Sequence, residues 1–210
     1  MFVSVSITLA EQCNFPIIIK YHFTMRKLKL QVQMSVDGYV AGPNGELDWM
    51  TWNLDSKLIN FITELTDSSD TILLGRKMTE GFVNYWEAVQ PNSPEYSFAL
   101  KMVNTPKVIF TKTLDKPIGK NTSLAKGNLS DEIMKLKKQE GKDIVVYGGA
   151  GFVSALIQGR HIDEFNFFIN PVMINKGMRI FDLANMRQEL SLVSTTPYEC
   201  GITVLRYQLK

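Results

Sequence analysis

The residues best placed to do chemistry lie in a glycine-rich turn within IVVYGGAGFVSALIQG, at positions 144–159. An apolar strand leads into this turn and an apolar helix is predicted directly after it; the turn is Gly148, Gly149, Ala150 and Gly151, followed by Phe152. Glycines allow a backbone to approach a ligand closely, and the free N–H groups and dipole at a helix start favour an anion such as a pyrophosphate. The turn is not the full dinucleotide fingerprint, so a tight strand-to-helix turn without a ligand explains it equally well.

Two further apolar strands also end in residues that suit a phosphate. Gly75, Arg76 and Lys77 follow a strand predicted over 71–74, and Thr111 with Lys112 follows the strand KVIF. Cations at the carboxyl end of a strand suit a nucleotide phosphate, although a solvated basic pair also explains Arg76 and Lys77. Because ligands gather at the carboxyl edge of open α/β sheets, the three strand ends together favour a dinucleotide cleft.

A polar loop over 35–55 places carboxylates beside tryptophans. The carboxylates are Asp37, Glu46, Asp48 and Asp55, and the tryptophans are Trp49 and Trp52. A carboxylate next to an indole ring can be partly desolvated, which raises its pKa and suits proton donation, and it can also hold the edge of a pterin or pyrimidine ring. Each has a structural alternative: Asp37 fits a turn with Gly38, Asp55 fits a helix cap at least as well as a catalytic role, and both tryptophans fit a core.

Composition argues against several other classes of protein. The chain has 210 residues and a net charge of +2, with two cysteines in no recognisable motif and two histidines. The small net charge gives no reason to expect nucleic acid or a membrane as a partner, and the cysteines and histidines offer little for a metal site or a disulfide framework. No Ser/His/Asp pattern is present, and a reducing, cytoplasmic location is expected.

The apolar pattern predicts one α/β domain over 25–210 that positions these residues. Alternation over 28–34 indicates a strand, and further strands are predicted over 107–111, 144–147, 164–170, 189–195 and 202–209. Helices are predicted after Asp55 or Ser56, from Ser93-Pro94-Glu95, from Ser130 to Gly141, and over 152–158. The first part alternates β and α and the last part is β-rich, which favours a mixed sheet that ends in an antiparallel hairpin. Residues 1–24 are interpreted as an extension outside this domain, because a second possible start, Met25, precedes the first clear strand.

In this order the motifs resemble the dihydrofolate reductase superfamily, most closely the branch that contains the reductase domain of bacterial riboflavin biosynthesis. The segments that carry the resemblance lie within 26–209 and are SVDGYVAGPNGELDWM, TILLGRKMTE, KVIFTKTL, IVVYGGAGFVSALI and DEFNFFINPVMINKGMRIF. The resemblance implies a dihydrofolate-reductase-like, three-layer α/β fold with a central mixed, mostly parallel sheet and a C-terminal antiparallel hairpin. It also implies a homodimer, NADPH as the cofactor and hydride transfer to a carbon–nitrogen double bond.

The resemblance further assigns roles to individual residues. Those expected to contact NADPH are Gly75, Arg76 and Lys77 at its adenosine side, Thr111 and Lys112 near its 2′-phosphate, Gly148, Gly149, Ala150, Gly151 and Phe152 at its pyrophosphate and nicotinamide, and Val40 and Ala41 at the nicotinamide through backbone groups. Trp49 and Thr51 would contact the substrate, and Asp55 falls close to the pterin-binding carboxylate of dihydrofolate reductases. Where the riboflavin reductases hold the substrate phosphate with an arginine, this chain offers Lys57, which lacks the bidentate fork.

The sequence therefore predicts an NADPH-dependent reductase that acts on a C=N or carbonyl-like carbon of a pyrimidine or pterin. The leading substrate is a 5-amino-6-(5-phosphoribosylamino)uracil-type compound, and the proton would come from water, Asp48 or Asp55. Dihydrofolate reduction is the nearest alternative. A nucleotide-binding sensor or scaffold that has lost catalysis is an alternative of another class.

Overall fold

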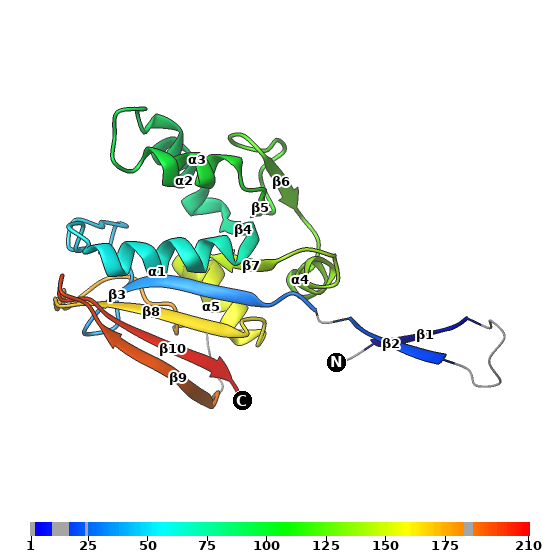
Figure 1. Cartoon of the computed structure of the whole chain (residues 1–210). Coiled ribbons are helices and arrows are strands. Elements are labelled where there is room, and N and C mark those ends of the chain that lie inside the picture. Colours follow the sequence, from blue (N-terminus) through cyan, green and yellow to red (C-terminus); the bar gives the residue numbers. More distant parts are fainter. Residues whose placement is uncertain (1–2, 10–16, 24, 183–186) are drawn as a thin grey trace.

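The fold is built on an eight-stranded sheet with helices packed against both of its faces (Figure 1). The computed structural model describes residues 3–9, 17–23, 25–182 and 187–210. Its strands are β1 (Val3–Leu9), β2 (Ile17–Phe23), β3 (Leu28–Ser35), β4 (Ser69–Gly75), β5 (Lys107–Phe110), β6 (Thr122–Ala125), β7 (Asp143–Val146), β8 (Glu164–Asn170), β9 (Leu190–Pro197) and β10 (Thr203–Leu209). Its helices are α1 (Ser56–Asp67), α2 (Arg76–Ala88), α3 (Tyr96–Asn104), α4 (Leu129–Lys137) and α5 (Ala150–Gln158).

Most of the large sheet is parallel. Its order is β6-β5-β4-β7-β3-β8-β10-β9, and each pairing from β6 to β8 is parallel. β10 runs antiparallel to both β8 and β9, and β9 forms the outer edge. The predicted mixed, mostly parallel sheet with a C-terminal antiparallel hairpin is confirmed.

The N-terminal strands form a separate sheet. β1 and β2 pair antiparallel with each other, with Val3 opposite Phe23 and Leu9 opposite Ile17. Residues 1–2, 10–16 and 24 of the predicted extension lie outside the described residues. The division into an extension over 1–24 and a domain over 25–210 stays a prediction.

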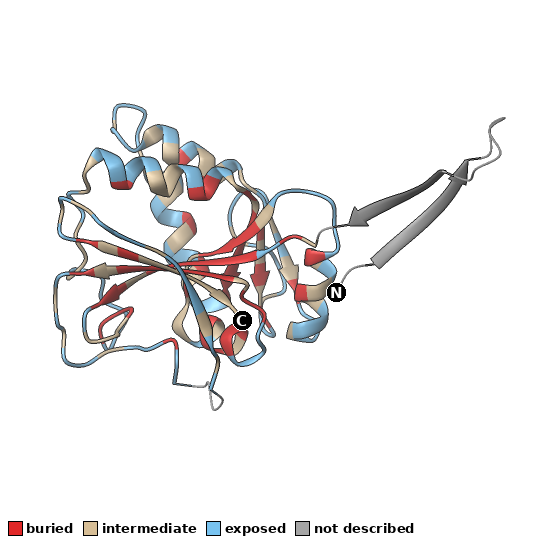
Figure 2. Ribbon diagram, turned by 60° about the horizontal axis from the view of Figure 1, so that its bottom comes forward, coloured by how far each residue is buried: buried red, intermediate tan, exposed pale blue. Residues whose placement is uncertain are grey.

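Alternation along the central strands decides which helices cover which face. Leu28, Leu30, Val32 and Met34 of β3 are buried in one core cluster with residues of α4 and α5. On the other face, α1 packs against the sheet near Phe168, and α2 and α3 pack further along it. Buried residues accordingly follow the central strands in Figure 2, where the outer helix surfaces are exposed. Two helical layers and the sheet between them give the three-layer fold.

Two predicted helix boundaries differ from the structure by three or more residues. The helix expected from Ser93-Pro94-Glu95 begins at Tyr96, because Ser93 to Glu95 form a turn in which the Ser93 carbonyl accepts from Tyr96 N at 3.1 Å. Ala99 and Met102 of this helix are in the core, whereas Leu100 is 42% exposed.

The helix expected to reach Gly141 ends at Lys137 instead. The Lys137 side chain is buried, and its ammonium donates to the His161 carbonyl at 2.7 Å and to Asp163 Oδ2 at 2.5 Å. This tertiary anchor holds the last turn of α4 against the start of β8.

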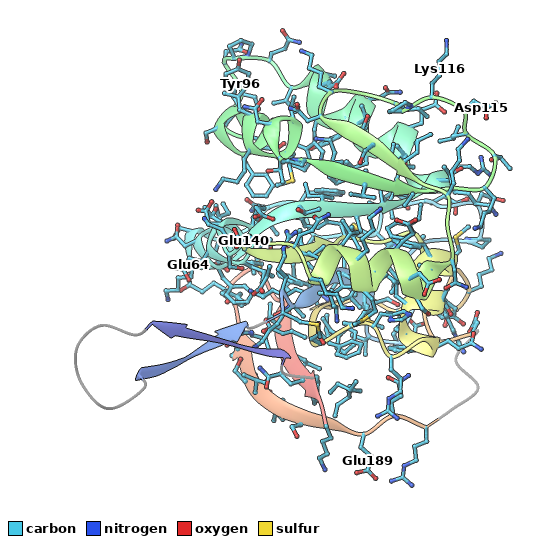
Figure 3. The ribbon with its side chains drawn as sticks, turned by 90° about the vertical axis from the view of Figure 1, so that its right-hand side faces the viewer. Glu64, Tyr96, Asp115, Lys116, Glu140 and Glu189 are labelled. Carbon is cyan, nitrogen blue, oxygen red and sulfur yellow. The ribbon has the colours of Figure 1, made fainter. Side chains whose placement is uncertain are left out.

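The strand β6 was not predicted at all. It is four residues long, TSLA, and Ala125 is its one buried residue, so it carries too little apolar pattern to indicate a strand. Its position at one end of the sheet puts the preceding loop, with Asp115 and Lys116, far from Glu189 and the β9 edge (Figure 3).

The parallel arrangement brings the predicted site segments to one edge. Because parallel strands end on the same side of a sheet, the loops after β3, β4, β5, β7 and β8 all leave from the carboxyl edge. None of the helices among the described residues is long and apolar enough to span a bilayer.

Candidate functional site

Two glycine turns meet at the carboxyl edge of the neighbouring strands β4 and β7. Gly75 is the N-cap of α2, and Gly149 is the N-cap of α5 with a left-handed φ of 86°. A Cβ at Gly75 would lie 2.7 Å from the Cβ of Phe152, and a Cβ at Gly149 would lie 3.8 Å from the Cα of Gly75. The close approach explains the glycine at 75, and the backbone conformation explains the glycine at 149.

Both helix starts keep backbone N–H groups available for an anion. Neither Gly75 nor Gly149 can supply a side-chain cap, and no side-chain cap bond forms at either helix start. Arg76 and Lys77 are exposed, and within residues 25–182 and 187–210 their side chains form no hydrogen bond or ion pair. Uncapped N–H groups, two helix dipoles and two unpaired cations form a cradle that fits the phosphates of a dinucleotide. These groups could therefore hold the phosphates of NADPH.

The third strand end is already occupied by contacts of the chain itself. The Thr111 hydroxyl is buried and accepts from the backbone N–H groups of Thr113 and Leu114 at 3.1 and 3.0 Å. The Lys112 ammonium donates to the carbonyls of Lys126 and Gly127 at 2.7 and 2.6 Å. Lys112 therefore brings positive charge to this edge, but it would have to leave two carbonyls to bind a 2′-phosphate.

Phe152 packs between the strand ends. Its ring lies 4.9 Å from the ring of Phe110, the last residue of β5, and its Cβ fills the space left by Gly75. The residue expected to contact the cofactor thus also holds β4, β5 and α5 together. The contact with Phe110 is made by the Phe152 ring, so it requires the whole Phe152 side chain.

Half of the backbone hydrogen-bonding groups of Val40 and Ala41 have partners. Val40 N donates to the Met178 carbonyl at 2.9 Å, and Met178 N donates to the Ala41 carbonyl at 2.8 Å. Elsewhere in the described part of the chain, nothing pairs with the Val40 carbonyl or the Ala41 N–H. Both residues are buried, and a buried backbone group without a partner is unfavourable. The free Val40 carbonyl and the free Ala41 N–H therefore suit a ligand amide.

Asp55 caps α1. Its Oδ1 accepts from Lys57 N and Leu58 N, both at 3.0 Å, and its Oδ2 accepts from Cys200 N at 3.1 Å. The hydrogen bond from Leu58 N is the largest cause that lowers the pKa of Asp55 below its ordinary value. A carboxylate held ionised by three N–H groups suits a cap and does not suit a proton donor. The geometry therefore favours the capping role over the catalytic role expected for Asp55.

The other carboxylates of the loop differ in their surroundings. Asp48 is exposed. Trp52 is 62% exposed, so it is not a core residue. Asp37 forms the expected turn with Gly38, and its carboxylate also accepts from Ile174 N and Asn175 N at 3.2 and 2.8 Å. The side-chain hydrogen bond from Ser35 is the main cause that lowers the pKa of Asp37.

Lys57 already has an acidic partner. Its Nζ lies 3.0 Å from Glu199 Oε1 in the turn between β9 and β10, and both side chains are 75% exposed. An exposed pair of this kind is weak and can open for a ligand. Glu199 nevertheless places a negative charge beside the lysine that was expected to meet a substrate phosphate.

The sequence did not point to Asn170, which joins the loop over 35–55 to the sheet. This side chain is fully buried at the carboxyl end of β8, and its Oδ1 accepts from Thr51 N at 2.9 Å. The half-buried Trp49 bonds locally, with its Nε1 donating to the Glu46 carbonyl at 3.1 Å. A polar residue at the end of the apolar strand EFNFFIN, directly before Pro171, was the available signal.

An open hollow of about 680 Å³ lies away from these residues, at the amino ends of β5 and β6. Its lining includes Pro106, Lys107, Pro117 and Thr122. The buried Lys107 ammonium points to the carbonyls of Met102, Val103 and Thr105 at the end of α3, with distances of 2.8 to 2.9 Å. Lys107 therefore has a structural partner set, and the hollow gathers no catalytic group.

The sheet order, the helices on both faces and the glycine-capped helix starts at the carboxyl edge define a dihydrofolate-reductase-like fold. The family model described as the RibD C-terminal domain matches residues 26–204. The chain belongs to this family, in agreement with the resemblance of its motifs.

Individual proteins support the assignment. The uncharacterized protein YyaP of Bacillus subtilis (strain 168) is 30% identical over 182 residues, which are 87% of this chain and 94% of that protein. A putative riboflavin biosynthesis protein from Shewanella sp. PV-4 matches with a TM-score of 0.68 at 20% identity, over 89% of this chain and 99% of that chain.

Two solved enzymes share the fold. A diaminohydroxyphosphoribosylaminopyrimidine deaminase/5-amino-6-(5-phosphoribosylamino)uracil reductase from Thermotoga maritima matches with a TM-score of 0.64 at 14% identity, over 89% of this chain and 57% of that chain. Dihydrofolate reductase from Enterococcus faecalis, complexed with NADP(H), matches with a TM-score of 0.57 at 18% identity, over 88% of this chain and 96% of that chain. At these identities the two matches establish the fold, which is that of RibD-like pyrimidine reductases.

Proposed function

We propose that this protein is an NADPH-dependent reductase that delivers hydride to a C=N or carbonyl-like carbon of a pyrimidine or pterin. The observation that carries the proposal is the pair of uncapped helix starts at Gly75 and Gly149, beside the unpaired cations Arg76 and Lys77. When bound, NADPH would supply the hydride, and the protein would supply binding, orientation and electrostatics.

The residues divide the cofactor between them. Gly75, Arg76 and Lys77 would hold the adenosine side, and residues 148–152 would lie along the pyrophosphate and nicotinamide. Thr111 and Lys112 would face the 2′-phosphate, with Lys112 exchanging two carbonyl partners for it. The free Ala41 N–H and Val40 carbonyl match the acceptor and donor of a carboxamide, and this supports their place at the nicotinamide.

For the substrate, a 5-amino-6-(5-phosphoribosylamino)uracil-type compound leads because the chain belongs to the RibD C-terminal domain family. Trp49 and Thr51 would contact its ring, and Lys57 its phosphate. The proton would come from water or Asp48, since the contacts of Asp55 keep that carboxylate ionised. Dihydrofolate stays a second candidate, because the pairing of Lys57 with Glu199 weakens the case for a phosphate.

NADPH binding and oxidation test the proposal. Titration of tryptophan fluorescence would give the Kd, and absorbance would follow oxidation with the aminouracil phosphate and with dihydrofolate in turn. Arg76→Ala should weaken NADPH binding by about 1–3 kcal/mol if it pairs with phosphate. Lys120→Ala, which removes one exposed charge at the opposite edge, is the control. Failure of the wild-type protein to bind NADPH would refute the proposal, and binding without turnover of either compound would favour the sensor or scaffold.

A homodimer is part of the proposal. Leu192 of the edge strand β9 is 59% exposed and lies opposite Tyr207, and Phe181, at 44% exposure, packs on Phe167 of the same sheet face. An exposed apolar face beside an open sheet edge suits contact with a second copy. Sedimentation as a monomer at micromolar concentration would contradict the homodimer.

Two further predictions stay open. We expect a small molecule as the partner, without nucleic acid or membrane, and a cytoplasmic location.

A further inference from the structure

The segment 47–54, which contains Trp49 and Thr51, is hydrogen-bonded to the sheet at one point, and Leu54 at its end packs on the apolar cluster around Phe168. Its other hydrogen bonds are local: Met50 N donates to the Leu47 carbonyl at 3.2 Å and Leu54 N to the Trp52 carbonyl at 3.0 Å. Within the described residues, the hydrogen bond from Thr51 N to Asn170 Oδ1 is its single hydrogen bond to another element. Leu54 fixes the end of the segment, and the position of Thr51 and its neighbours depends on the hydrogen bond to Asn170.

Asn170 is held so that its oxygen must face the loop. Its Nδ2 donates to Gln33 Oε1 at 2.8 Å and lies 3.2 and 3.4 Å from the carbonyls of Phe168 and Met34. The opposite orientation would place the amide NH₂ against the Thr51 N–H and the amide oxygen against three acceptor oxygens. The side chain is also fully buried, so water cannot relieve either conflict.

We propose that Asn170 is a positioning residue that fixes the substrate segment 47–54 through the Thr51 N–H. The inference rests on the proposed function, because it assigns this segment to the substrate. Asn170 itself lies beneath the loop, acts through Thr51 and is not assigned a contact with the reacting atoms. Gln33 supports it by accepting from the amide NH₂ and so setting the amide orientation.

Asn166 provides a matched control on the same strand. It is also fully buried, four residues earlier on the same face of β8, and its amide bonds to the Leu30 carbonyl, Glu164 and Arg206. Asn166→Ala removes a buried amide of equal size but no contact with the loop. Any general loss of stability should appear in both alanine variants, whereas release of the loop should appear in Asn170→Ala alone.

Hydrogen exchange on the full chain tests the positioning directly. In Asn170→Ala the Thr51 amide should exchange roughly tenfold faster than in the wild type, as expected for loss of one buried hydrogen bond. Gln33→Ala keeps the Asn170 side chain but removes one acceptor for its amide NH₂. This variant should accelerate exchange of the Thr51 amide by a smaller factor. The proposal would be overturned if amides across 47–54 exchanged equally fast in Asn170→Ala and Asn166→Ala. If Asn170→Ala does not fold, an unchanged exchange rate of the Thr51 amide in Gln33→Ala would overturn it.

Kinetics then test the consequence for catalysis. With the aminouracil phosphate or dihydrofolate, Asn170→Ala should lower kcat/KM roughly tenfold to a hundredfold. NADPH affinity should change much less than kcat/KM, because the residues assigned to the phosphates of the cofactor follow β4, β5 and β7. Asn166→Ala should leave both quantities near the wild type. A wild-type protein that turns over neither compound would contradict the proposed function, while the exchange of Thr51 would still decide the role of Asn170.

Discussion

Substitution of Gly75 by alanine tests the contact between the two glycine turns. A Cβ at this position would lie 2.7 Å from Phe152 Cβ and 3.2 Å from its Cγ. Carbon atoms prefer about 3.5–4.0 Å, so α5 or the end of β4 must move by roughly 1 Å. The nearest atom is attached to the backbone of α5, so rotation of the phenyl ring cannot relieve the clash.

The size of the effect follows from this displacement. Overpacking in a well-packed region costs about 1–3 kcal/mol. For a chain of this length, each kcal/mol lowers Tm by about 2–4 °C, which gives a decrease of about 2–12 °C. NADPH binding should weaken as well, because the clash displaces the two helix starts that would face its phosphates relative to each other.

Gly81→Ala is the matched control on the same helix. Gly81 is exposed inside α2, and a Cβ there meets nothing within 4 Å. Alanine is the better helix former by about 0.5–1 kcal/mol, so this variant should have a higher Tm and an unchanged Kd for NADPH. Thermal unfolding and fluorescence titration measure both variants. A Gly75→Ala protein with wild-type Tm and wild-type Kd would refute the contact.

Three other predictions follow from the charged groups. Asp55→Asn should retain kcat, because Asp55 serves as a cap, and Asp48→Asn should lower kcat if Asp48 and not water supplies the proton. Steady-state NADPH oxidation measures both variants, and loss of turnover in Asp55→Asn alone would show that the Asp55 carboxylate is catalytic. Burial lowers the pKa of His161 below its ordinary value of 6.5, so the unfolded chain takes up a proton first and stability falls as the pH drops below 6.5. His161→Gln should flatten that decline in denaturant titrations at several pH values, and an unchanged slope would contradict the burial effect. Glu199→Gln should free Lys57 and so lower KM for the aminouracil phosphate at low salt, without changing KM for dihydrofolate. If the variant and the wild type have the same KM for the aminouracil phosphate, Lys57 does not belong to the phosphate site.

Much of the fold could be predicted because its signals are local. The alternation over 28–34 marked β3, and apolar runs that end in glycine marked β4 and β7. The strand over 164–170 was predicted with its observed bounds. Elements with a weak local pattern were harder, and the four-residue β6 was missed. The end of α4 was placed too late, because burial of Lys137 against Asp163 ends the helix.

By itself, the sequence determined most strands and helices in their order, the glycine turns and the residue types at the strand ends. These depend on apolar period and on backbone freedom, which neighbouring residues reveal. Tertiary structure alone decided that Asn170 holds Thr51, that Lys57 meets Glu199, and that Asp55 receives a third N–H from Cys200. These partners are between 119 and 145 residues apart. Contacts across such distances arise from the packing of β8 and the β9–β10 turn against the loop before α1, and they leave no periodic pattern in the chain.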